Sequence, residues 1–319
     1  MEGLNFEEAG EFCQNVVDQV GTVIVGKKAV LEKVMLAILS NSHILFEDNP
    51  GLAKTLLARS FAMSMGCNFS RVQFTPDLLP ADITGTYVYN VKTTEFELRK
   101  GPIFTNVLLA DEVNRAPPKT QAALLEAMQE RQATLDGKTH PIQDPFIVIA
   151  TQNPIEYEGV YPLPEAQLDR FIVKLRLGYP NRMEEVEILR RRMKRATEDV
   201  HLEPVLETDT ILEMQRKLEE IHIDDDILGY VTDIVQATRN QRQIEVGSSP
   251  RGSLAIFKLC RARAVFHGRD YVVPDDVKEV AVSALVHRVI MKTESWVKGT
   301  DPIQSIEEVL KTVPVPTTK

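Results

Sequence analysis

The feature that most constrains the fold is a series of short apolar runs in the first 180 residues, which alternate with segments of helical period. The runs are His43–Phe46, Phe69–Phe74, Val107–Ala110, Phe146–Ala150 and Phe171–Leu177. The segments of helical period span 1–20, 28–40, 54–65 and 119–131. Short buried strands that alternate with helices predict an α/β fold, in which a five-stranded parallel sheet is sandwiched between helices.

After Tyr179-Pro180-Asn181 the pattern changes, and the rest of the chain has helical period almost throughout. Helices are predicted over 182–198, 209–221, 225–243, 251–267 and 275–291. Pro250, Gly268 and Pro274 stand where such helices would begin or end. We therefore predict an α/β domain over 1–180 and a smaller all-α domain over 181–319, with a frayed tail at 313–319.

Composition narrows the class of protein. The net charge of −9 argues against nonspecific binding of nucleic acid, which depends on basic surface. No apolar run approaches the roughly 20 residues that cross a bilayer, and the N-terminus lacks a basic start, so we expect no membrane insertion and no signal peptide. Cys13, Cys67 and Cys260 are too few and too scattered for a disulfide framework, which predicts reduced thiols and a cytoplasmic protein.

The segment Glu47–Thr55 (EDNPGLAKT) lies between an apolar run and a helix. In that context, backbone N–H groups at the helix N-terminus bind phosphate oxygens. Lys54 would reach the β- and γ-phosphates, and the Thr55 hydroxyl would bind Mg²⁺. The segment departs from the pattern GxxxxGK[ST], because Asp48 and Ala53 take its two glycine positions and a carboxylate near phosphate is unfavourable. Taken alone, the segment fits an ordinary turn equally well.

Polar residues also follow two other apolar runs. Asp111 and Glu112 end the first, where Asp111 would hold Mg²⁺ through its water shell and Glu112 would polarise the attacking water. Asn153 follows the second and would hold that water or sense the γ-phosphate. The alternatives are a solvated acidic turn and a turn asparagine before proline. Ligands of open α/β sheets bind beyond the carboxyl ends of the strands, which favours the functional interpretation.

Two arginines are candidates for completing the site. Arg170 precedes the last apolar run, at the edge of the α/β domain, where it would reach the γ-phosphate of a neighbouring copy. From spacing alone, a salt bridge of Arg170 with Asp169 or Glu165 is the preferred interpretation. Arg251 begins a helix of the second domain and would fold over the phosphates when that domain closes. The alternative for Arg251 is a surface arginine after an ordinary proline N-terminus.

Together these segments resemble the AAA+ ATPases and, within them, the MoxR family, which is similar to the ATPase subunit of magnesium chelatase. The resemblance is carried by NPGLAKT (49–55), GPIFTNVLLADEVNRAPPKTQAALLEAMQE (101–130), PFIVIATQNP (145–154), EGVYPLPEAQLDRF (158–171) and SPRG (249–252). The match runs in order from about residue 20 to residue 270. It implies an AAA+ nucleotide-binding domain followed by a helical lid.

The resemblance also implies a role for each matched residue. The Walker A loop, which binds ATP with Mg²⁺, falls on Asn49, Pro50, Gly51, Leu52, Ala53, Lys54, Thr55 and Leu56. Val25 and Gly26 fall on the adenine side of the nucleotide. Walker B falls on Asp111 and Glu112, sensor 1 on Asn153, the arginine finger on Arg170 and sensor 2 on Arg251. Segments 80–105 and 132–145 look like the helix-2 insertion and the pre-sensor-1 hairpin, which line or cap the central pore in relatives.

The function that the resemblance implies is an ATP hydrolase, usually a hexameric ring, that remodels or activates a protein client. Family partners often carry a von Willebrand factor A domain with a metal-dependent adhesion site. A nucleic-acid-dependent motor is the alternative, although its hairpin would need more basic residues than Lys138 and His140 beside Asp136. A nucleotide-gated scaffold with little turnover is a third reading, suggested only by Asp48.

Overall fold

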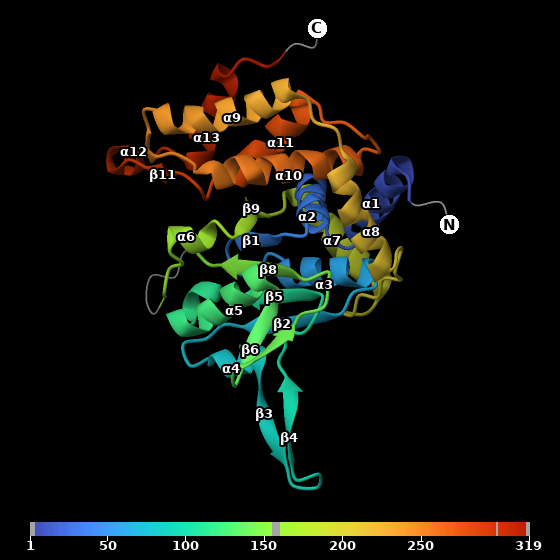
Figure 1. The fold of residues 1–319 in the computed structure, drawn as a ribbon. Helices are drawn as coiled ribbons and strands as arrows, with labels where there is room; N and C mark the ends of the chain where they lie inside the picture. Colours follow the sequence, from blue (N-terminus) through green and yellow to red (C-terminus); the bar gives the residue numbers. More distant parts are fainter. Residues whose placement is uncertain (1–3, 155–159, 298, 317–319) are drawn as a thin grey trace.

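A five-stranded parallel sheet lies at the centre of the molecule, with the strand order β2-β5-β8-β1-β9 (Figure 1). This computed structural model describes residues 4–154, 160–297 and 299–316. The strands of the sheet are β1 (His43–Glu47), β2 (Phe69–Gln73), β5 (Val107–Asp111), β8 (Ile147–Gln152) and β9 (Phe171–Leu175). The predicted sheet is therefore confirmed, although β9 ends two residues before the predicted Leu177. Because the strands are parallel, all of their carboxyl ends meet at one edge of the sheet.

The sheet separates two apolar cores, because successive side chains of a strand point to opposite faces. In β5, Val107 and Leu109 join one core, whereas Leu108 and Ala110 join the other. The first core holds the buried residues of α1 (Phe6–Gly21), α2 (Lys28–Leu39) and α3 (Lys54–Ser64). The second holds those of α4 (Pro80–Thr84) and α5 (Pro118–Glu130). Strands buried on both faces have no polar alternation, which explains the continuous apolar runs in the sequence.

Two antiparallel hairpins leave the α/β domain. One pairs β3 (Gly85–Asn90) with β4 (Glu95–Lys100), and projects below the body of the molecule in Figure 1. The other pairs β6 (Gln132–Leu135) with β7 (Lys138–Pro141), as predicted for segment 132–145. Its turn places Asp136 and Gly137 at φ values of 47° and 78°, which a two-residue hairpin loop requires. The hairpins contact each other, because the Tyr87 hydroxyl lies 3.1 Å from Nε2 of His140.

A mainly helical lid lies above the sheet in Figure 1, and is built from α9 (Asp225–Asn240), α10 (Pro250–Phe266), α11 (Pro274–Leu285), α12 (Thr293–Val297) and α13 (Pro302–Thr312). Two helices that precede the lid in the sequence, α7 (Arg182–Arg195) and α8 (Thr208–Lys217), lie beside the sheet instead. Short elements complete the chain, namely the 3-10 helices η1 (Val113–Arg115) and η2 (Leu218–Glu220), the one-turn helix α6 (Glu165–Leu168), and the strands β10 (Ile244–Val246) and β11 (Ile290–Met291). Side-chain caps begin several helices, such as the capping box of Asn181 and Glu184 at α7.

Three predictions for the lid are corrected. The helix predicted over 275–291 ends at Leu285, and β11 pairs with β10 instead, so the lid is not helical throughout. The helices predicted over 182–198 and 225–243 end earlier, at Arg195 and Asn240. Helix α13 was not predicted at all. The tail is ordered at its start, where Val313 is buried, and its last three residues lie outside the described residues.

Two further expectations were tested. Among the described residues, none of the helices combines the length and the apolar character needed to cross a membrane. The three cysteines are free thiols, and Cys13 and Cys260 are buried.

Candidate active site

The loop between β1 and α3 has the conformation of a phosphate-binding turn. Gly51 and Ala53 have φ values of 80° and 57°, so the chain turns sharply before Lys54 begins α3. Ala53 adopts the left-handed conformation that glycine adopts without steric cost, which explains why glycine is usual at that position. No side chain caps the first turn of α3, so its N–H groups are directed at the space in front of the loop.

Asp48 is oriented differently from what its place in the loop suggests. Its carboxylate accepts backbone hydrogen bonds from Leu177 (2.5 Å) and Gly178 (3.2 Å), and the residue is only 7% exposed. Leu177 and Gly178 belong to the segment 176–181 between β9 and α7, which we call the interdomain linker. The linker also meets the loop at Tyr179, whose hydroxyl accepts a hydrogen bond from Nδ2 of Asn49. The Asp48 carboxylate therefore holds the linker, although the residue also borders the cavity in front of the loop.

Lys54 lies at the base of the loop. Its ammonium donates to the carbonyl oxygens of Asp48 and Asn49, both at 2.9 Å. Partial burial lowers the pKa of Lys54 from its usual value, and the carboxylates of Asp48, Asp111 and Glu112 oppose that shift. Phosphate oxygens of a bound nucleotide could replace the two loop carbonyls as acceptors of the lysine N–H groups.

The acid pair lies at the carboxyl end of β5, opposite the loop. Asp111 Oδ1 accepts from the Thr151 hydroxyl and Oδ2 from Arg71, both at 2.7 Å. Glu112 has a φ of 56°, and its Oε2 accepts from Gln73 at 2.7 Å and from Arg115 at 2.9 Å. The left-handed backbone at Glu112 turns its side chain away from Asp111 and toward β2. These contacts fix both carboxylates at the edge of the sheet before any ligand arrives.

A cavity of about 450 Å³ joins these groups, within the range of small-molecule sites. Of the predicted site residues, it is lined by Pro50, Gly51, Leu52, Ala53, Lys54, Thr55, Leu56, Asp111, Glu112 and Asn153. Arg71, Gln73 and Thr151 also line it, and the sequence reasoning missed them. Arg71 and Gln73 had a detectable signal, because they alternate with buried residues at the carboxyl end of a predicted strand.

The lining of this cavity suits a magnesium nucleotide. The unpaired helix N-terminus and Lys54 match phosphate, and the oxygens of Thr55 and Asp111 are the ligand type that Mg²⁺ prefers. Among the described residues, no group of three or more histidine, cysteine and acidic side chains is placed to bind a metal by itself. That arrangement fits Mg²⁺, which binds one or two protein groups together with substrate phosphates.

Val25 and Gly26 do not line the cavity. They lie in the turn before α2, and a Cβ at Gly26, whose φ is 73°, would overlap the Glu184 carboxylate of α7. Lys27 adds a contact with the same carboxylate at 3.9 Å. The turn is therefore covered by α7, and its role on the adenine side stays a prediction.

The two candidate arginines lie together, but not beside Lys54. Arg170 and Arg251 line a second cavity of about 460 Å³, near the first residue of β1, His43. Lys54 follows the other end of β1, and a five-residue strand spans about 13 Å. Arg170 donates to Gln129 and to the carbonyl oxygen of Leu125 in α5. The two arginines therefore occupy the opposite edge of the sheet from the phosphate loop of their own chain.

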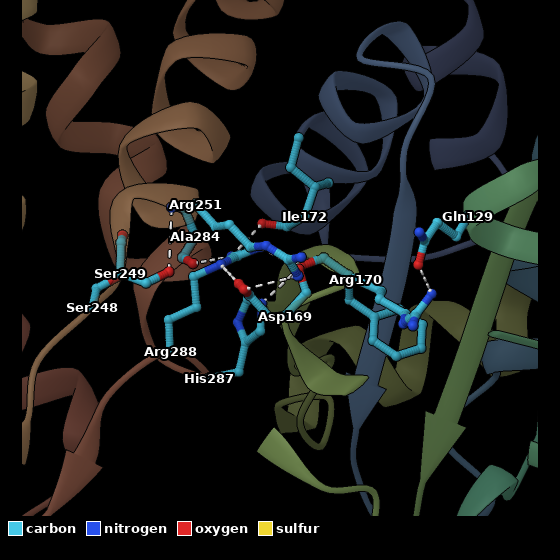
Figure 2. A network of polar contacts seen from close by, with 11 residues as sticks. Gln129, Asp169, Arg170, Ile172, Ser248, Ser249, Arg251, Ala284, His287 and Arg288 are labelled. Atoms are coloured by element: carbon cyan, nitrogen blue, oxygen red, sulfur yellow. Dashed lines mark hydrogen bonds and ion pairs between the residues drawn. The ribbon is translucent and has the colours of Figure 1, made fainter. Parts of the chain in front are cut away.

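The salt bridge expected from spacing is wrong. Among the ion pairs of the described residues, Arg170 joins neither Asp169 nor Glu165. The Asp169 carboxylate pairs instead with Arg288 at 2.6 Å and with Arg251 at 3.4 Å, both from the lid (Figure 2). Part of the motif that carries these residues, at 158 and 159, lies outside the described residues.

Comparison with known proteins places the chain among ATPases. Residues 43–173 match the ATPase family associated with various cellular activities (AAA), and residues 236–309 match the AAA lid domain. The chain is 40% identical to a protein of Cytophaga hutchinsonii described as a candidate ATPase, whose crystal structure superposes with a TM-score of 0.90 over 97% of this chain and 96% of that one.

Curated relatives cover most of the chain as well. Chaperone MoxR1 of Mycobacterium tuberculosis is 43% identical over 312 residues, which are 95% of this chain and 82% of the relative. The uncharacterized protein YeaC of Bacillus subtilis is 47% identical over 310 residues, 97% of each chain. A magnesium-chelatase subunit ChlI homolog of Methanocaldococcus jannaschii is more distant, at 29% identity over 202 residues, 59% of this chain and 51% of that protein. With this fold, this loop and these relatives, the chain belongs to the MoxR family of AAA+ ATPases.

Proposed function

We propose that this protein hydrolyses ATP with Mg²⁺ at a site shared between two copies of the chain, and uses the energy to remodel a protein client. The observation that carries the shared site is the separation within one chain. Lys54 and the acid pair lie at one edge of the sheet, whereas Arg170 and Arg251 lie at the other. A second copy can bring that other edge to the phosphates, which a single chain cannot do.

In this proposal, each side chain has a defined task. Lys54 and the N-terminus of α3 bind the phosphates, and Thr55 and Asp111 hold Mg²⁺, which neutralises phosphate charge when it is bound. Glu112 accepts a proton from the attacking water, once it leaves Gln73 and Arg115. Arg170 and Arg251 of the next copy stabilise the charge that develops on the γ-phosphate, an effect of about 10³–10⁵ in rate for an arginine finger.

Assembly follows from the same geometry. Each copy would present a phosphate loop at one edge and an arginine pair at the other, so a head-to-tail arrangement generates a ring. The family resemblance favours a ring of six copies, in which segments 80–105 and 132–145 would line or cap the pore. It also makes a von Willebrand factor A domain protein the expected partner, and the MoxR1 name supports a chaperone role.

The nucleic-acid alternative has less support in the hairpin that would carry it. Lys138 lies 5.4 Å from the centre of the Tyr87 ring, and His140 lies 3.1 Å from the Tyr87 hydroxyl. Both basic side chains therefore contact the other hairpin of their own chain. A shift of single-stranded DNA at physiological salt would favour the alternative over a protein client.

Mixing two inactive variants tests the shared site. Lys54→Ala should lose nucleotide binding, and Arg170→Ala should bind ATP but release phosphate 10³-fold or more slowly. Rings mixed from the two should regain activity. At one kind of interface, the Arg170→Ala chain supplies an intact Lys54 and its Lys54→Ala neighbour supplies an intact Arg170. Verified mixed rings without any recovery would contradict a shared site.

A further inference from the structure

Arg288 uses every hydrogen-bond donor that an arginine has. It follows α11 in the lid, and its side chain is 5% exposed. Its Nε donates to the Asp169 carboxylate at 2.6 Å. Nη1 donates to the carbonyl oxygens of Ile172 (3.2 Å) and Ala284, and Nη2 to those of Asp169 (3.1 Å) and Phe171 (2.8 Å). A guanidinium has five N–H groups, so none is left for another partner.

Four of these five hydrogen bonds go to residues that lie on either side of Arg170 in the sequence. Asp169 precedes Arg170, and Phe171 and Ile172 follow it at the start of β9. Figure 2 shows Asp169 and Ile172 close to Arg288. Within the described part of the chain, β9 is at the end of the sheet and pairs only with β1, so its outer carbonyls need partners from elsewhere. The lid supplies them, because His287 also donates from Nε2 to the Phe171 carbonyl, at 2.8 Å.

The side chain of Arg170 is held by a different part of the molecule. It donates to Leu125 and Gln129 of α5, in the α/β domain. The lid therefore contacts the backbone that carries Arg170, whereas α5 contacts its guanidinium. Because all donors of Arg288 are bonded, a rotation of the lid would pull on Asp169, Phe171 and Ile172 by way of this side chain. The same rotation would move Arg170 relative to α5.

We propose that Arg288 is a positioning residue, which makes the placement of Arg170 in the neighbouring active site depend on the position of the lid. This inference rests on the shared site proposed above. The interdomain linker, through which the chain continues toward the lid, is bonded to the phosphate loop of the same chain by Asp48. The state of one nucleotide site would thereby set the rate at the next one in the ring. A shift of about 1 Å in a catalytic group can change a rate 10²-fold, so the coupling needs only a small motion.

A mixture of two variants isolates this effect in the neighbour's site. Arg170→Ala chains keep their own nucleotide machinery and supply no finger, whereas Glu112→Gln chains supply the finger and hydrolyse slowly. The mixture should therefore be active. The activity should arise only at interfaces where a Glu112→Gln chain supplies Arg170 to the active site of an Arg170→Ala chain. Adding Arg288→Lys to the Glu112→Gln chain keeps the positive charge, but a single ammonium cannot reach acceptors spread around a guanidinium. Phosphate release should then fall 10- to 100-fold at unchanged KM for ATP.

Arg269→Lys in the Glu112→Gln chain is the matched control. Arg269 also lies in the lid and forms a bidentate pair with the buried carboxylate of Asp276, at 2.7 and 2.9 Å, but it does not touch β9. This mixture should keep full activity, and both double variants should bind a fluorescent ADP as Glu112→Gln does. Asp169→Ala, which removes the acceptor of the Arg288 Nε, should repeat the loss if Arg288→Lys fails to fold.

The outcomes separate the two proposals. No activity in the reference mixture of Arg170→Ala and Glu112→Gln would overturn the shared site itself. An active reference with an equally active Arg288→Lys mixture would overturn only the positioning role. Equal losses for Arg288→Lys and Arg269→Lys would also overturn it, because the effect would then be general damage to the lid.

Discussion

Replacing Asp48 with glycine gives opposite predictions from the motif and from the structure. The substitution restores the first glycine of the GxxxxGK[ST] pattern and removes a negative charge from the phosphate loop, so the motif alone predicts tighter nucleotide binding. In the structure, the same change removes the acceptor of two backbone N–H groups, those of Leu177 and Gly178. We therefore expect a less stable protein that binds nucleotide no more tightly.

The size of the effect follows from those two bonds. An unsatisfied buried N–H costs about 1–3 kcal/mol, so two cost about 2–4 kcal/mol when one regains partial contact with water. Unfolding entropy scales at about 2.1 cal/mol/K per residue, so 1 kcal/mol corresponds to about 1.5 °C for a chain of this length. Asp48→Gly should thus lower the melting temperature by about 3–6 °C.

Differential scanning fluorimetry and titration with a fluorescent ADP measure the two quantities side by side. Asp48→Asn serves as the charge control, because its amide keeps one acceptor oxygen while it loses the negative charge. Its melting temperature should lie between those of the wild type and Asp48→Gly. Asp48→Gly could instead bind nucleotide more tightly, with an unchanged or raised melting temperature. The Asp48 carboxylate would then be an unfavourable charge in the loop and not the hydrogen-bond acceptor that holds the linker.

Three other predictions concern the active site and one buried histidine. Lys54→Ala should abolish binding of fluorescent ADP, since Lys54 supplies the ammonium group among the described residues that line the cavity. Glu112→Gln should bind ATP normally but release phosphate about 10²–10⁴-fold more slowly. Stability should fall by about 2 kcal/mol between pH 6.5 and 5, measured by urea unfolding, because burial lowers the pKa of His43 to about 3 while the unfolded chain still takes up the proton near pH 6.5.

The histidine prediction has a structural cause and a control. His43 donates from Nε2 to the Met128 carbonyl and accepts at Nδ1 from the Val148 N–H, so a second ring proton has no acceptor. Its contribution is complete above pH 6.5 and is lost as the pH falls, because the folded pKa is the lower one. His43→Asn should reduce the pH dependence without abolishing it, because burial also lowers the pKa of His287 well below its usual value. An unchanged slope would remove His43 as a source. Normal turnover of Glu112→Gln would likewise end its role as general base.

The sequence determined the five strands of the central sheet to within a few residues. Continuous apolar runs are a property of strands buried on both faces. Such runs can be recognised in the sequence without knowing which strands are neighbours in the sheet. The phosphate loop, the acid pair and Asn153 could be predicted as one site for a related reason. Parallel strands bring their carboxyl ends to one edge, so residues at those ends meet whatever the intervening chain does.

Tertiary structure decided what local pattern leaves undetermined. Helical period continues beyond Leu285, with no glycine or proline to stop it, yet the chain leaves the helix there and β11 pairs with β10. The sequence neighbours of Arg170 suggested Asp169 as its partner, but a lid arginine more than a hundred residues away takes that carboxylate. Asp48 likewise turns from the phosphate loop to the interdomain linker. Each outcome depends on which buried donors and acceptors meet in space, and spacing along the chain does not contain that information.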